Sequence, residues 1–145
     1  MNPEPASPSN TSLDLRRVLL SPLRLFAFWL AVVLLVTLIG QPGVVCVTPL
    51  AWLIAGWVGI DVATNSKSKE SGRRLVEAGL AGAWFGFLEG ILFWVIAPRM
   101  GPIQASEQAS AAAIGILMVV MGMLVGAAAS VFAAVLVERR HRLEA

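Results

Sequence analysis

The sequence predicts an all-α integral membrane protein, a bundle of four transmembrane helices, and three observations carry this prediction. Of the 145 residues, 57% are hydrophobic and only 14% are charged, which is more apolar material than one soluble core of this size can bury. The apolar residues gather in four runs of 17 to 25 residues. A helix needs about 20 apolar residues to cross a bilayer. The basic residues stand almost entirely at the ends of those runs, as they do in membrane proteins.

The first span is expected at about residues 22–39. Before it, residues 1–12 combine three prolines with small polar side chains and predict a disordered tail, so the four-span domain is expected over 13–145. Leucines beside Arg16 and Arg17 suggest a short amphipathic segment at the membrane surface. Pro22 then suits the first position of a new helix. A cleaved signal peptide is disfavoured, because the run is long and no small-x-small site follows it.

The second span, at about residues 44–60, carries Pro49 five residues after its start. A proline there removes one backbone hydrogen bond, so the helix either kinks or begins at Thr48 and Pro49. Residues 61–74 are the only strongly polar internal stretch and are expected to form an aqueous loop. The third span is expected at about residues 75–97.

The fourth span is expected at about residues 113–137. No helix breaker stands between Pro102 and Arg142, so this helix can extend beyond the bilayer. Small residues recur every fourth position in the last two spans, a spacing that lets two membrane helices approach closely. These candidate helix-packing residues are Ala78, Gly82, Gly86 and Gly90 in the third span, and Gly115, Gly122, Gly126, Ser130 and Ala134 in the fourth. Ala51, Ala55 and Gly59 repeat the spacing in the second span.

The charges predict the topology. Four spans put both termini and the 61–74 loop on one side, and that side holds ten of the eleven basic residues. Only Arg99 lies opposite. Short cytoplasmic loops are enriched in Lys and Arg, so we expect a multi-pass protein of the cell membrane with both termini in the cytoplasm.

The residue types needed for most enzyme chemistry are missing from the apolar spans. The only histidine, His141, stands in the charged C-terminal segment, and Asp14 and Asp61 lie at span ends. This pattern predicts no catalytic triad, no metal site and no cofactor. The single Cys46 cannot form an intramolecular disulfide, and no basic stripe indicates nucleic-acid binding. The sequence therefore favours a non-enzymatic protein.

Two carboxylates remain as candidate functional residues. Glu77 follows Arg73 by four residues at the start of the third span, which predicts an interfacial ion pair. Glu89 lies roughly 4 to 5 Å from the midpoint of that span at 1.5 Å per residue. A charge at that depth costs about 2.5 to 3.5 kcal/mol, so the carboxylate is expected to face other helices or water. Thr48 and Thr37 fall in the same half of the bilayer, and we expect Glu89 to hydrogen-bond to them.

Two classes of function follow from these features. The first is a non-enzymatic accessory, assembly or stabilising subunit of a larger membrane complex, or a small homo-oligomer, whose partners are the lipid bilayer and a membrane protein or a second copy. Short loops and abundant small-residue surface favour it. The alternative is a small proton- or cation-coupled transporter or channel with Glu89 as the ion-coupling residue. Only Glu89 and the discontinuity at Pro49 favour that alternative.

Overall fold

The computed structural model describes residues 15–38, 44–66, 70–96 and 108–144, and these residues form four α-helices. The helices are α1 (Leu15–Leu38), α2 (Val44–Asn65), α3 (Ser71–Ile96) and α4 (Gln108–Glu144). The all-α prediction is confirmed over this part of the chain. Three of the helices are long and apolar enough to cross a membrane, with candidate spans at Leu15–Val36, Ser71–Val95 and Ala112–Arg140. The predicted tail at 1–12 lies outside the described residues.

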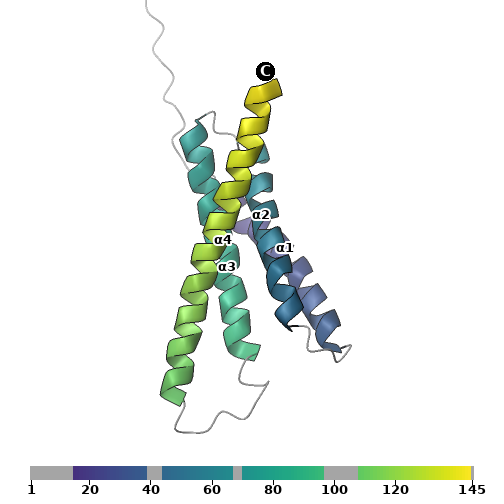
Figure 1. Ribbon diagram of the computed structural model, residues 1–145, viewed down its shortest axis with the longest axis vertical. Coiled ribbons are helices and arrows are strands. Elements are labelled where there is room, and N and C mark those ends of the chain that lie inside the picture. The colour runs from purple at the N-terminus through teal and green to yellow at the C-terminus, as the bar shows by residue number, and fades with distance from the viewer. Residues whose placement is uncertain (1–14, 39–43, 67–69, 97–107, 145) are drawn as a thin grey trace, which may run out of the picture.

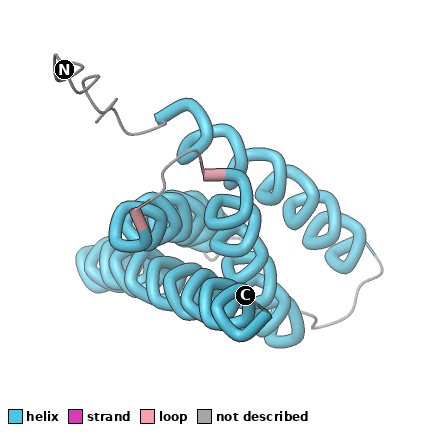
Figure 2. The backbone as a smooth tube through the Cα atoms, turned by 90° about the horizontal axis from the view of Figure 1, so that it is seen from above, coloured by secondary structure: helices cyan, strands magenta, loops and turns pink. Residues whose placement is uncertain are grey.

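The four helices form two hairpins that run side by side and spread apart toward one end (Figure 1). The most extensive contact joins α3 to α4, and α2 packs against both of them. Helix α1 contacts α2 and α3 but, among the described residues, does not contact α4 (Figure 2). The bundle is therefore built around α2, α3 and α4, with α1 on its flank.

Helix α1 does not restart at Pro22. It is continuous from Leu15 to Leu38, and Pro22 lies inside it, fully buried. A proline at this position leaves the carbonyl of Val18 without its helical N–H. The segment around Arg16 and Arg17, predicted to lie separately at the membrane surface, therefore forms the first turns of α1.

Helix α2 likewise includes its proline. It begins at Val44 and runs through Pro49, so the alternative in which the helix begins at Thr48 and Pro49 is wrong. At the other end α2 continues past Ile60 to Asn65, into the stretch expected to be loop. Two side chains there bond back to carbonyls of the last turn: Thr64 Oγ1 donates to Ile60 O at 2.8 Å, and Asn65 Nδ2 donates to Asp61 O at 3.0 Å. Both are local bonds from a side chain to a carbonyl about one turn earlier in the same helix.

Helix α4 is the longest element and extends beyond the predicted span at both ends. Its 37 residues correspond to about 55 Å at 1.5 Å per residue, whereas the hydrocarbon core of a bilayer is about 30 Å thick. In Figure 1 its yellow C-terminal turns rise above the other helices. The expectation that nothing interrupts this helix before Arg142 is confirmed from Gln108 onward.

Candidate functional site

Glu89 lies on the face of α3 that is turned toward α1. Phe85 and Phe93, one turn before and after it, share that face, because residues four apart on a helix are neighbours. Both rings pack edge-on against Trp29 of α1, with ring centroids 6.3 Å and 6.1 Å apart. Phe26 completes this aromatic cluster. The carboxylate is thus placed between two rings of an apolar contact between helices.

The polar atoms at this contact make few bonds. Trp29 is completely buried, and its Nε1 donor has no hydrogen-bond partner among the described residues. Glu89 is half-buried, and no described residue makes a hydrogen bond or an ion pair with its carboxylate. The side chains of Thr37 and Thr48 lie outside the described part of the chain, so the expected bonds to Glu89 stay a prediction.

Small residues of α3 lie directly against small residues of α4. A methyl group added to Gly86 would overlap the carbonyl of Gly122, and one added to Gly82 would overlap Gly126 O and the side chain of Ser130. At Gly90 the added atom would lie 2.6 Å from the Cα of Val119. The two backbones are therefore in contact over these turns, with no side chain between them. Ala78 and Ala134 are buried nearby, and Gly115 lies under the ring of Trp94.

Ser130 joins three helices at one point. Its hydroxyl is fully buried and donates to the carbonyl of Ala55 on α2 at 2.5 Å. Gly59, one turn further along α2, lies against the backbone of Ser130. The sequence marked Ser130 only as a small residue, because nothing in the spacing distinguishes a serine that packs from one that donates a bond between helices.

Glu77 is buried inside the bundle. The structure puts Arg73 Nε 3.5 Å from Glu77 Oε1, with the Glu77 side chain only 5% exposed. The hydroxyl of Ser66 also donates to Glu77 Oε2 at 2.8 Å. The carboxylate therefore ties the end of α2 to the first turns of α3, a contact that the sequence did not predict.

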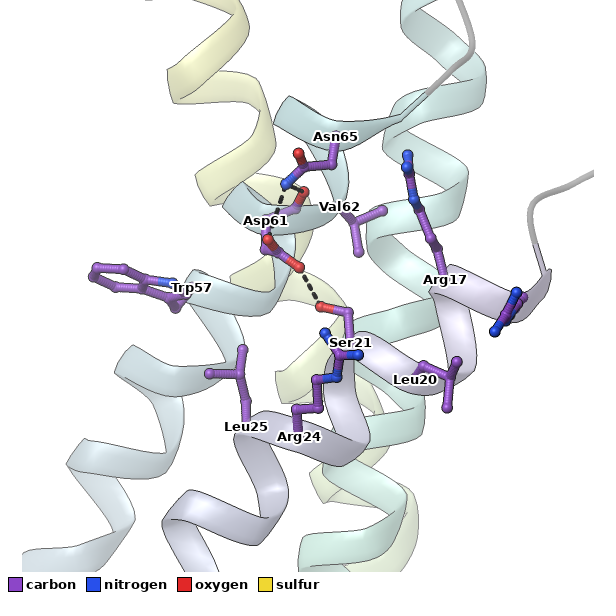
Figure 3. A pocket seen from close by; sticks show the side chains of 10 residues that line it. Arg17, Leu20, Ser21, Arg24, Leu25, Trp57, Asp61, Val62 and Asn65 are labelled. Carbon is purple, nitrogen blue, oxygen red and sulfur yellow. Dashed lines mark hydrogen bonds between the residues drawn. The ribbon is translucent and has the colours of Figure 1, made fainter.

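A second polar group links α1 to α2 at the same end of the bundle (Figure 3). The hydroxyl of Ser21 donates to Asp61 Oδ2, and Asn65 Nδ2 donates to Asp61 Oδ1 at 3.0 Å. These residues line a cavity of about 610 Å³ together with Arg16, Arg17 and Arg24. Sequence reasoning placed Asp61 at a span end but assigned it no partner, because the partner is 40 residues away in the chain.

The described side chains offer no group of three His, Cys, Asp or Glu residues that could hold a metal ion. The polar side chains at Glu89 and at the Asp61 end offer hydrogen bonding and charge interaction. No protein family model, curated protein or solved structure matches this chain.

Proposed function

We propose that this chain is a non-enzymatic integral membrane protein that acts by binding another membrane chain. It would serve as an accessory, assembly or stabilising subunit of a larger complex, or assemble with copies of itself. The single observation that carries the proposal is Glu89, a half-buried carboxylate in an apolar helix with no hydrogen bond to any described residue. A carboxylate in the apolar part of a membrane pairs with polar groups or faces water. A second protein chain in the membrane is one source of a polar group that pairs with Glu89.

The exterior of the bundle supports membrane insertion and association. Large apolar side chains stand exposed along α4, and Leu117, Met121 and Leu124 share one face of it. Leu124 is 61% exposed. A soluble monomer rarely exposes a continuous apolar stripe of this kind, because the stripe belongs against lipid or protein.

The distribution of charge supports an orientation with both termini in the cytoplasm. The arginines at the start of α1, the start of α3 and the end of α4 all lie at one end of the bundle, because neighbouring helices are antiparallel. They are Arg16, Arg17, Arg24, Arg73, Arg74, Arg139 and Arg140. Short cytoplasmic segments of membrane proteins are enriched in basic residues, which supports a cytoplasmic position for this end of the bundle in a cell membrane.

The test is the native mass of the full chain after mild detergent extraction from its own membranes, with co-purifying chains identified by mass spectrometry. A fixed ratio with a larger membrane subunit, or a multiple of 15.4 kDa, is the expected result. Glu89→Gln keeps a hydrogen-bonding side chain and should retain the partner, whereas Glu89→Leu removes it and should release the partner. Recovery of the wild-type chain as a lone monomer would contradict the proposal.

A second candidate function is a small proton- or cation-coupled transporter with Glu89 as the coupling group. The observation that favours it is the indole N–H of Trp29 on the helix that faces Glu89, which has no hydrogen-bond partner among the described residues. A donor and a carboxylate without bonds can hold a water molecule between them. Ion flux into liposomes tests it. Flux that is present in the wild type and lost in Glu89→Gln supports transport, because the amide cannot titrate.

A further inference from the structure

The cavity between the start of α1 and the end of α2 carries an excess of positive charge. Three arginines and one aspartate line it. The aspartate is already engaged, because Asp61 accepts hydrogen bonds from Ser21 and Asn65. Arg16 and Arg24 are exposed, and no ion pair joins either of them to a described carboxylate. The cavity therefore presents the guanidinium groups of Arg16 and Arg24 to a ligand.

Two of the three arginines reach the cavity from one helix face. Arg17, Ser21 and Arg24 follow one another at intervals of four and three residues, so they project from the same side of α1. In Figure 3 the side chain of Arg24 lies just below the bond between Ser21 and Asp61, and Arg17 lies on the opposite side of that bond from Trp57. Guanidinium groups suit an oxyanion with several acceptor oxygens, such as phosphate.

The cavity also lies at the boundary between the polar end and the apolar surface of the bundle. Trp57, at its rim, is 66% exposed, and a tryptophan near a span end is typical of the headgroup region. Leu25 lines the cavity on α1, and Phe28, one turn deeper along the helix, is 62% exposed. A ligand with a phosphate at the arginines would thus have apolar protein surface directly beside it.

We infer that this cavity binds the phosphate group of an anionic phospholipid, whose acyl chains lie along the exposed apolar side of α1. Basic pockets between membrane helices on the cytoplasmic side are suited to anionic headgroups. The cavity of about 610 Å³ has room for a headgroup. The inference does not rest on Glu89 or on any protein partner, since neither Glu89 nor the aromatic residues beside it line the cavity.

The test is a lipid titration of the full-length protein in detergent micelles, followed by native mass spectrometry, with phosphatidylglycerol or phosphatidylcholine as the probe. We expect tighter binding of phosphatidylglycerol. Each arginine near the membrane surface contributes on the order of fivefold in affinity for an anionic lipid, so Arg24→Gln should weaken binding about fivefold and Arg16→Gln with Arg24→Gln roughly twenty-five-fold. Helix content measured by circular dichroism verifies that each variant is folded.

Two matched variants separate the cavity from general surface charge. Arg139→Gln removes the same charge from an exposed position of α4 that does not line the cavity, and it should change the affinity less than twofold. Asp61→Asn should tighten binding, because it removes the one negative charge while its amide oxygen still accepts the Ser21 hydroxyl. An unfolded variant cannot produce this gain.

Three outcomes would overturn the inference. Equal affinity for the two lipids shows that the cavity does not distinguish an anionic lipid from a zwitterionic one. An equal loss for Arg24→Gln and Arg139→Gln assigns the effect to surface potential alone. Displacement of the lipid by an equal concentration of glycerol phosphate assigns the cavity to free phosphate compounds and not to a lipid.

Discussion

Replacing Gly86 by alanine tests the contact between α3 and α4 most directly. The added Cβ would meet three atoms of α4, and all three belong to the backbone of Gly122 and Met123. The most distant of them, Met123 N, is only 2.9 Å away, whereas an ordinary Cβ contact begins at 3.4 Å. Backbone atoms cannot rotate away as the end of a side chain can. The two helices must therefore separate along these turns.

Two contributions lower the stability of the Gly86→Ala variant, and one raises it. Forcing extra volume into a packed contact costs about 1 to 3 kcal/mol, and a gap of 0.5 to 1 Å removes roughly a quarter to a half of the dispersion energy of the separated atoms. Alanine in place of glycine returns about 1 kcal/mol through helix propensity. Because the overlap at Gly86 involves backbone on the other side, we expect the free energy of unfolding to fall by about 2 kcal/mol.

The assay is reversible unfolding of the full chain in mixed micelles as the fraction of denaturing detergent increases, followed by tryptophan fluorescence. Gly56→Ala is the matched control, because the nearest atom to its added Cβ is Ala133 Cβ at 3.8 Å, an ordinary contact. That variant should be unchanged or slightly more stable. Gly79→Ala, with Val131 Cγ2 at 3.1 Å, should fall between the two. Equal stability of the Gly86 and Gly56 variants would refute the close approach of α3 and α4.

Two further variants probe single polar groups by the same unfolding assay. Ser130→Ala removes the donor to the Ala55 carbonyl and should lower the free energy of unfolding by about 0.6 to 1.7 kcal/mol, the range for hydrogen bonds between membrane helices; no loss of stability would show that the bond contributes nothing. Trp29→Phe should cost less than about 1 kcal/mol because the lost N–H has no described partner, whereas Trp29→Ala should cost roughly 3 kcal/mol through lost packing. A large cost for the phenylalanine variant would indicate that the indole N–H is bonded after all.

The sequence by itself was enough to predict the helices and their order. Long apolar runs in a chain with few charges can only satisfy their backbone as helix, and the polar segments between them mark where the direction reverses. The spacing of Gly82, Gly86 and Gly90 also predicts a face of α3 with no bulky side chains, and packing through that spacing stays a prediction. These features depend only on local composition and on the period of the helix.

Tertiary structure decided which residues are inside and what they contact. In a soluble helix an apolar stripe marks the buried face. Helix α4 is apolar on nearly every side, and lipid and protein neighbours both favour apolar side chains, so its composition does not show which side is buried. The sequence therefore did not distinguish Trp29 from the other tryptophans, although in the structure Trp29 is completely buried and Trp57 is exposed. The bond from Ser21 to Asp61 and the burial of Glu77 depend on which helices meet and at what rotation. Those are properties of the packed bundle, and no local pattern in the chain encodes them.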